Sequence, residues 1–262
     1  MVPDEPFTAA DFIASGSVLL VAAHPDDEVI GAGGQLSRLR DFIEILHVTN
    51  GSPGNNLDYA EARRRELLEA VALAGISAAQ CSQVGVIDQQ TSFNLAGIAR
   101  RIATFLDRFR PHIVLTHPYE GGHPDHDSCA FAVHAAVRRS AAIRRIWEFT
   151  SYHIGPNGGI ETGVFLKTDE APETAIKLSA EQQTLKKEMF DCFGTQRHVL
   201  ADFRLEEERF RPAPQYDFTQ PPHPGKLYYE HFEWGVTGSR WRELAAEALH
   251  DLGLNLHATH RC

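Results

Sequence analysis

Hydrophobic positions along the chain alternate between short continuous apolar runs and longer amphipathic segments. Short runs are typical of strands buried on both faces, and amphipathic segments are typical of helices. The predicted strands comprise residues 17–23, 43–48, 83–87, 112–116 and 143–149. The predicted helices comprise a segment that opens at the glycines of 31–34, then 58–74, 94–109 and 127–140. This alternation predicts a Rossmann-like α/β fold with a mostly parallel sheet and helices on both faces.

The rest of the chain is less regular and predicts a smaller β-rich or irregular C-terminal part. The expected elements there are strands at 162–167 and 175–178, helices at 180–193 and 240–252, an extended surface loop at 210–224 and a strand packed on the core at 228–234. A short helix is also expected near the N-terminus, at 9–14.

Length and charge exclude several classes of protein. The chain has 262 residues, 43% of them hydrophobic, and a formal net charge of −10. This length suffices for one core, and the negative charge argues against a general nucleic-acid or anionic-membrane surface. No apolar run approaches the ~18 residues that a membrane helix needs, and the acidic N-terminus is not typical of a signal peptide. The four cysteines are scattered without CxxC spacing, so a reducing cytoplasm is the expected location.

Two clusters of metal-binding residue types follow predicted strands. His24-Pro-Asp-Asp-Glu28 follows the first strand, and His123-Pro-Asp-His126 follows the strand at 112–116. In sheets of this kind, ligands bind beyond the carboxyl ends of the strands. We therefore expect both clusters at the same edge of the sheet, where they would form one site.

These residue types suit a catalytic zinc ion, which takes three protein ligands and keeps an open position. His24 and Asp27 are three positions apart on a tight turn, so both side chains could reach one metal ion. Asp26 would project differently, which leaves it free to act as a base. His123 and His126 offer a further ligand and a polar catalyst, and a carboxylate two positions from a histidine can fix the tautomer of the imidazole.

Simpler interpretations exist for each cluster. The carboxylates of each cluster are also typical of charges that complement a helix N-terminus. A single histidine after a strand is commonly a polar loop residue. The conjunction of two such clusters at one sheet edge favours a metal centre. A nucleotide-binding Rossmann protein is disfavoured, because Gly31, Gly33 and Gly34 do not form GxGxxG and the acidic turn would repel a pyrophosphate.

Together the two motifs resemble those of the zinc-dependent N-deacetylases of the PIG-L/LmbE type. The resemblance rests on His24-Pro-Asp-Asp-Glu28 with Gly33-Gly34, and on His123-Pro-Asp-His126. Further segments similar to the family pattern are Arg63-Arg-Arg-Glu66, Arg110-Pro-His-Ile-Val-Leu-Thr116, Leu185-Lys-Lys-Glu188 and Thr195-Gln196. The resemblance covers about residues 17–200. It implies an enzyme that removes the acetyl group from N-acetylglucosamine-containing molecules.

The resemblance also implies a role for residues of the first motif. His24 and Asp27, with His126 of the second motif, would bind one Zn²⁺ per chain. Fe²⁺ is an alternative metal, because His and carboxylate ligands discriminate poorly between the two. Asp26 would be the general base that deprotonates the attacking water.

The remaining roles that the resemblance implies concern stabilisation of the oxyanion and recognition of the sugar. His123 would stabilise the oxyanion or protonate the leaving amine, with Asp125 paired to it. Arg63 would contact the sugar or a phosphate on it; the alternative is a solvated helix face that Arg63 shares with Glu66.

We thus expect a zinc-dependent N-deacetylase that acts on a small-molecule sugar or a glycoconjugate. One alternative is an amidase or deacylase for a larger acyl chain or a thiol conjugate, and another is a non-catalytic metal-binding module. The module is disfavoured by Asp26 and His123, since a purely structural site needs no base. Ser52 and Gly121 depart from residues that are common in the family, so the details of oxyanion stabilisation and sugar recognition stay open.

We expect one deacetylase domain over residues 1–262. Its core would span about residues 17–200, and a C-terminal extension, residues 201–262, would pack on or near the active site. The sequence leaves open whether the protein forms a homo-oligomer.

Overall fold

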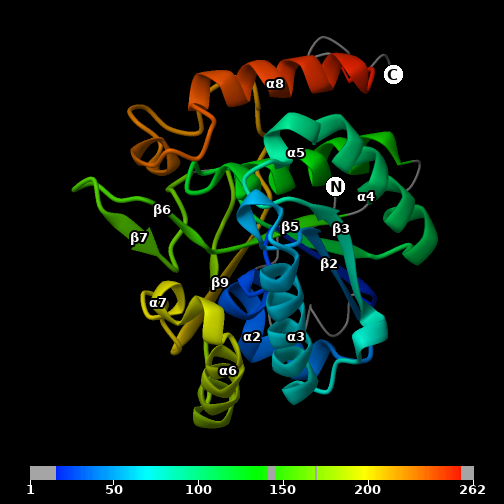
Figure 1. Cartoon of the computed structure of the whole chain (residues 1–262), viewed down its shortest axis with the longest axis vertical. Helices are drawn as coiled ribbons and strands as arrows, with labels where there is room; N and C mark the ends of the chain where they lie inside the picture. The colour runs from blue at the N-terminus through cyan, green and yellow to red at the C-terminus, as the bar shows by residue number, and fades with distance from the viewer. Residues whose placement is uncertain (1–15, 141–144, 169, 255–262) are drawn as a thin grey trace.

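A seven-stranded sheet forms the centre of the molecule (Figure 1). The computed structural model describes residues 16–140, 145–168 and 170–254, so the helix predicted at 9–14 lies outside the described residues. The strand order is β3-β2-β1-β4-β5-β9-β8. The strands are β1 (Val18–Ala22), β2 (Ile43–Thr49), β3 (Cys81–Val86), β4 (Ile113–Thr116), β5 (Arg145–Phe149), β8 (Thr174–Lys177) and β9 (Glu207–Pro212).

Five of these strands run parallel and two do not. β1, β2, β3, β4 and β5 pair in parallel, whereas β9 is antiparallel to β5 and β8 is antiparallel to β9. A separate hairpin consists of β6 (Tyr152–Ile154) and β7 (Ile160–Thr162). The predicted α/β fold with a mostly parallel sheet and a smaller β-rich part is confirmed.

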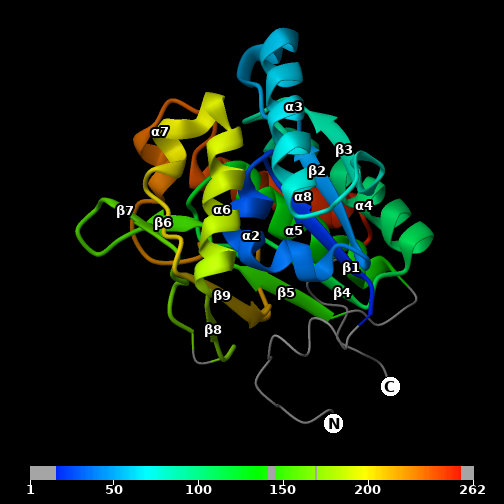
Figure 2. The same cartoon turned by 90° about the horizontal axis from the view of Figure 1, so that it is seen from below.

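Helices cover both faces of the sheet. The side chains of β1 alternate, so that Val18 and Leu20 contribute to one buried cluster and Leu19 and Val21 to the other. Figure 2 shows the helices of the first face in front of the sheet. The helices that pack on the first face are α2 (Asp27–Leu39), α3 (Leu57–Leu73) and α6 (Ala180–Cys192). Those of the second face are α4 (Leu95–Phe109), α5 (Pro124–Arg139) and, outermost, α8 (Gly238–Asp251). The short helix α7 (Arg197–Leu200) follows α6.

Helix α2 begins at Asp27, earlier than the glycines at which the sequence suggested its start. Its glycines serve close packing instead. A Cβ on Gly31 would lie 2.1 Å from Cδ2 of Phe149, and one on Gly34 would lie 2.6 Å from Leu178. The small residues therefore let α2 approach the sheet and β8 closely. Helix α5 likewise begins at Pro124, three residues before the predicted start, since proline suits the first turn of a helix.

Three predictions for the C-terminal part were wrong. No strand covers 162–167, since β7 ends at Thr162 and the Leu166 N–H instead donates to the Glu120 carboxylate. The predicted loop at 210–224 begins with the end of β9, because Arg211 is held in the sheet by buried carboxylates. The segment predicted as a strand at 228–234 contains a single 3₁₀ turn, Tyr228–His231, whose Tyr229 is buried.

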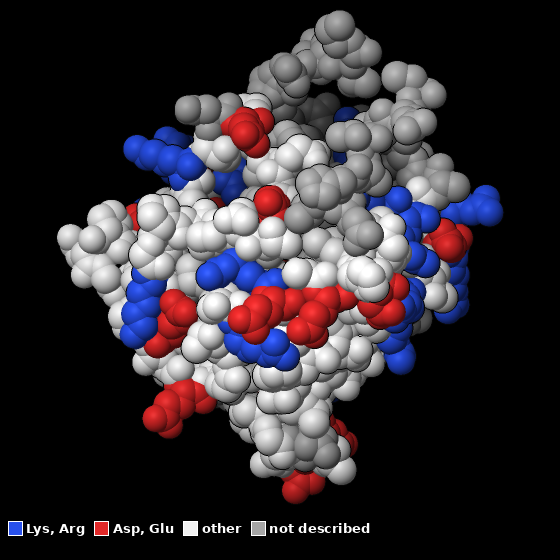
Figure 3. Space-filling model, turned by 90° about the horizontal axis from the view of Figure 1, so that it is seen from above, with Lys and Arg blue, Asp and Glu red and all other residues white. Residues whose placement is uncertain are grey.

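The surface over α8 carries charges of both signs. Seen from above, acidic and basic side chains lie beside one another rather than in patches of one sign (Figure 3). Arg240 pairs with Glu243 at 2.9 Å, and Arg100 pairs with Asp251 at 2.9 Å. This face therefore offers no broad basic surface. Among the described residues, no helix combines the length and apolar character needed to cross a lipid bilayer.

The connectivity creates a crevice at the centre of the sheet. The chain passes from β1 outward to β2 and β3 and then returns to β4, which pairs with the other side of β1. Connections thus leave β1 and β4 in opposite directions, and such a switch point opens a binding crevice beyond the carboxyl ends of the strands.

Candidate active site and metal centre

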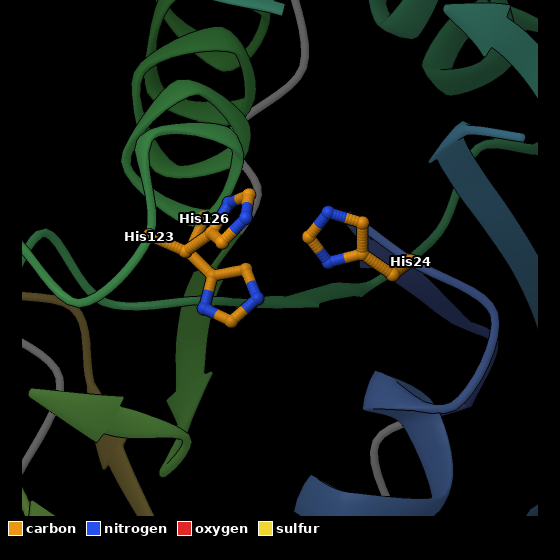
Figure 4. A group of neighbouring side chains, drawn as sticks. All are labelled: His24, His123 and His126. Atoms are coloured by element: carbon orange, nitrogen blue, oxygen red, sulfur yellow. The ribbon is translucent and has the colours of Figure 1, made fainter. Parts of the chain in front are cut away.

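Three histidines converge at this switch point (Figure 4). His24 follows β1, whereas His123 and His126 lie at the start of α5. The ring centroids of His24 and His123 are 4.6 Å apart, and those of His24 and His126 are 5.3 Å apart. The structure therefore brings together the two motifs, as expected from their positions after neighbouring parallel strands.

Asp27 is a buried carboxylate surrounded by donors. Its Oδ2 accepts the backbone N–H of His24 at 2.7 Å, and its Oδ1 lies 3.3 Å from Nε2 of His126. Burial opposes ionisation, but the imidazoles of His126 and His117 hold the pKa of Asp27 well below its usual range. The side chain is thus an anion, the form in which a carboxylate binds a metal.

His24 presents its two ring nitrogens to different partners. Nε2 lies 3.1 Å from Oδ1 of Asp88 and 3.2 Å from Oδ2 of Asp125, and Nδ1 lies 3.3 Å from Oδ2 of Asp27. Burial lowers the pKa of His24, but the three carboxylates raise it well above the usual value. The carboxylates of Asp88 and Asp125 favour a proton on Nε2, and Nδ1 faces Asp27. In known metal sites, a histidine likewise binds the metal through one ring nitrogen while the other donates a hydrogen bond to a carboxylate.

Possible ligand atoms form overlapping groups in which all atoms lie within 4.8 Å of one another. One group contains His24, His123 and His126, and another contains Asp27, His117 and His126. The three predicted ligands therefore spread over both groups, and His126 belongs to each. Imidazole and carboxylate donors of this kind fit Zn²⁺ or Fe²⁺. This histidine and aspartate cluster could bind a metal ion.

Asp26 lies beside this cluster and has an unusual environment. Burial raises the pKa of Asp26 to about 7, against the opposing effect of the Arg63 guanidinium, whose Nη2 lies 3.3 Å from Oδ2 of Asp26. A carboxyl group with this pKa can accept and release a proton near neutral pH.

The backbone of Asp26 has an unusual conformation and donates a hydrogen bond to Glu28. Its φ is 148° and its ψ is −26°, a region that side-chain-bearing residues rarely adopt. The Asp26 N–H donates to Oε2 of Glu28 at 3.1 Å, and the same oxygen lies 2.8 Å from Nε2 of the buried His47. Glu28 thus supports the turn through its contacts with Asp26 and His47.

Arg63 does not lie on a solvated helix face, so that alternative was wrong. The side chain is buried, and Nη2 donates to the carbonyl of Pro25 at 2.6 Å as well as pairing with Asp26. Glu66, the expected neighbour, instead accepts hydrogen bonds from Thr195. Arg63 therefore faces the site from α3.

Asp125 does not pair its carboxylate with His123, which corrects a second expectation. The Asp125 carboxylate turns away and accepts from Gln89 N–H at 2.7 Å and from the hydroxyl of Thr91, in addition to its contact with His24. Nδ1 of His123 accepts the backbone N–H of Asp125 at 3.1 Å. Because α5 begins at Pro124, this is the hydrogen bond that a helix N-cap residue makes.

The His123 ring is neutral and can donate one hydrogen bond. Burial and the neighbouring His24 together lower the pKa of His123 to about 3. With Nδ1 accepting a hydrogen bond, the single proton of the neutral ring is on Nε2. That N–H can stabilise a developing oxyanion.

The sequence analysis missed two contributors to the site. Asp88 follows β3, and the rule that placed the motifs at the carboxyl ends of strands would have found it too. His117, which directly follows β4, is buried next to Asp27. Its Nε2 accepts the Ala23 N–H at 3.1 Å, so the lone pair is engaged and His117 is a poorer candidate ligand than His24.

These side chains line a pocket of about 330 Å³. The predicted residues Asp26, Asp27 and Arg63 contribute to it, together with the three histidines. Further lining side chains come from outside the two histidine motifs, and they are Tyr59, Asp88, Tyr152, Gln196, His198 and Trp234.

Comparison with known proteins agrees with the resemblance seen in the sequence. Residues 19–137, which include both motifs, match the family model described as PIG-L: GlcNAc-PI de-N-acetylase. This part of the chain is therefore similar to the PIG-L family. Beyond it, the solved structure of N,N'-diacetylchitobiose deacetylase from Pyrococcus horikoshii matches 79% of this chain and 88% of its own length, with a TM-score of 0.58 and 19% identity. At this identity the likeness concerns the fold.

Two proteins similar to this chain carry named deacetylase activities. A 1D-myo-inositol 2-acetamido-2-deoxy-alpha-D-glucopyranoside deacetylase from Mycobacterium sp. (strain KMS) is 31% identical over 155 residues, which cover 47% of this chain and 50% of the relative. A probable N-acetyl-alpha-D-glucosaminyl L-malate deacetylase 2 from Bacillus subtilis (strain 168) is 32% identical over 139 residues, covering 47% of this chain and 61% of the relative. The chain thus spans between half and two thirds of the length of these relatives.

Proposed function

We propose that the protein is a zinc-dependent N-deacetylase that removes the acetyl group from an N-acetylglucosamine-type sugar or glycoconjugate and releases acetate and a free amine. The observation that carries this proposal is the convergence of His24, Asp27 and His126 with Asp26 and His123 on one pocket. The match to the PIG-L family and the activities named for the relatives support it.

His24, Asp27 and His126 would hold the ion. The donor set fits, because Nδ1 of His24 and Nε2 of His126 each lie 3.3 Å from an oxygen of the Asp27 carboxylate. When bound there, zinc would lower the pKa of a coordinated water to about 7 and polarise the acetyl carbonyl. Fe²⁺ would suit the same ligands.

The proton transfers fall to residues of the chain. Asp26 takes a proton from the attacking water as the new C–O bond forms. The Nε2–H of His123 donates a hydrogen bond to the oxyanion of the tetrahedral intermediate. As the C–N bond breaks, Asp26 returns its proton to the departing nitrogen, so that acetate and an amine leave the pocket. Arg63 orients Asp26 and contacts a hydroxyl group or a phosphate of the sugar.

Acetate release from a panel of N-acetylglucosamine conjugates tests the proposal. The metal-loaded protein is expected to release acetate from at least one conjugate and to stop when a chelator removes the metal, with activity restored by Zn²⁺ or Fe²⁺. The panel includes conjugates with longer N-acyl chains, which separate a deacetylase from an amidase of broader range. Absence of release from every conjugate by the metal-loaded protein would refute the proposed function.

A further inference from the structure

A continuous row of aromatic rings runs beside the pocket, which is lined by its members His123, Trp234 and Tyr152. We call the row from His123 through Trp234, Phe232 and Tyr228 to Tyr152 the aromatic wall. The successive ring centroids along it are 4.5, 4.6, 5.2 and 5.8 Å apart. Tyr152 in turn lies 5.2 Å from the ring of His126, so the wall begins and ends at the two histidines of the second motif.

The wall leads from the reacting centre toward solvent. Trp234 lines the pocket against His123, and Phe232 stacks on Trp234 at an interplanar angle of 14°. Phe232 is nevertheless 42% exposed. Exposed aromatic surface that continues a pocket is typical of a place where a ligand covers it. Since His123 is next to the acetyl group in the proposed reaction, a group stacked on Trp234 and Phe232 lies beyond the reacting sugar.

The charge of the pocket restricts what this group can be. The lining includes the carboxylates of Asp26, Asp27 and Asp88. Among the described lining residues, Arg63 is the single Lys or Arg, and its guanidinium is already engaged by Asp26 and by the carbonyl of Pro25. Three carboxylates against a single guanidinium make this lining unfavourable for an anionic substituent, whereas a neutral one meets no repulsion.

We propose that Trp234 and Phe232 form an aglycone subsite that binds a neutral substituent with a flat apolar face, such as an aromatic ring. The inference rests on the proposed deacetylase function and specifies its substrate class. The subsite comes from the segment after residue 200, outside the part of the chain that matches the PIG-L family model.

Tryptophan fluorescence tests binding without turnover. Trp147 and Trp241 are buried, so Trp234 is the tryptophan that a ligand in the pocket can reach. The metal-loaded Asp26→Asn protein is titrated with phenyl N-acetylglucosaminide, with N-acetylglucosamine and with carboxymethyl N-acetylglucosaminide. We expect quenching by the phenyl glycoside with a Kd about tenfold lower than for the other two sugars. Equal Kd values for all three would overturn the subsite.

Two substitutions locate the effect. Phe232→Ala and Trp234→Ala are each expected to reduce about tenfold the ratio of kcat/KM for the phenyl glycoside to kcat/KM for the carboxymethyl glycoside. Phe42→Ala is the matched control, since Phe42 is 46% exposed but lies outside the aromatic wall. A ratio that is unchanged in both variants, or that falls equally in Phe42→Ala, contradicts the subsite while acetate release still supports the proposed function. If no glycoside releases acetate, the proposed function fails, and the fluorescence titration alone decides whether the subsite exists.

Discussion

The guanidinium of Arg63 lies 3.3 Å from the carboxylate of Asp26, and both side chains are buried at the edge of the same pocket. Burial would otherwise make the Asp26 carboxylate unfavourable, because a charge without a partner is costly to remove from water. The pKa of Asp26, raised to about 7 by burial and limited by Arg63, reflects this balance. Arg63 therefore determines the pH range in which Asp26 can serve as a base.

Arg63→Met should move the pH dependence of the enzyme. Asp26 acts as a base in its ionised form, so kcat/KM rises with pH through its pKa. Loss of the guanidinium removes the effect that lowers the pKa, and the acidic limb of the profile should move to higher pH. The profile is measured by acetate release between pH 5 and 9. Arg63→Lys, which keeps a positive charge, is the control, and an unchanged limb in Arg63→Met would contradict this coupling.

Substitutions of the two adjacent aspartates should have different effects. Asp26→Asn is expected to lower kcat by about 10² to 10⁴-fold, the usual contribution of a general base, with the metal retained. Asp27→Asn is expected to lose the metal as well, because it removes the charge of a ligand. Metal content per chain is measured by elemental analysis after gel filtration. Equal metal loss in both variants would refute the division of roles between Asp26 and Asp27.

Glu120 makes the stability of the protein pH-dependent. Burial raises its pKa from 4.5 to about 7, against the effect of Arg211. A carboxyl group with a raised pKa binds its proton more tightly in the folded state. Its favourable contribution is therefore complete below about pH 4.5 and is lost as the pH rises toward 7.

Glu120→Gln tests this contribution. The Oε1 atom accepts from Leu166 and Arg211, and Oε2 has no hydrogen-bond partner, so the amide can replace the carboxyl group. The decrease in the free energy of unfolding between pH 5 and pH 8 should be smaller than in the wild type by about 2 kcal/mol. Urea unfolding at each pH measures it. Exposed Glu61 provides the control, as Glu61→Gln should follow the wild-type curve.

Gly31→Ala should destabilise the fold. The new Cβ would overlap the ring of Phe149, so α2 would have to move away from the sheet. Overpacking of this kind costs about 1–3 kcal/mol. Gly159→Ala is the matched control, since nothing lies within 4 Å of a Cβ at that position. Thermal unfolding compares the two variants, and equal melting temperatures would contradict close packing at Gly31.

The sequence was sufficient to predict the parallel sheet and the meeting of the two motifs. Both depend on local signals, namely apolar strands and the residues directly after them. The partner of Asp125 was not predictable in this way, because Thr91 and Gln89 approach its carboxylate only in the folded chain. The contact of Trp234 with His123 was not predictable either, since it depends on the packing of the C-terminal segment.

The unusual backbone conformation of Asp26 determines which substitutions at this position stabilise the protein. A φ of 148° costs a residue with a Cβ about 1–3 kcal/mol, and glycine would avoid most of that cost. Asp26→Gly should therefore unfold at a higher temperature than Asp26→Ala, although both lack the base. A search for thermostable variants without an activity screen would thus favour inactive proteins at this position.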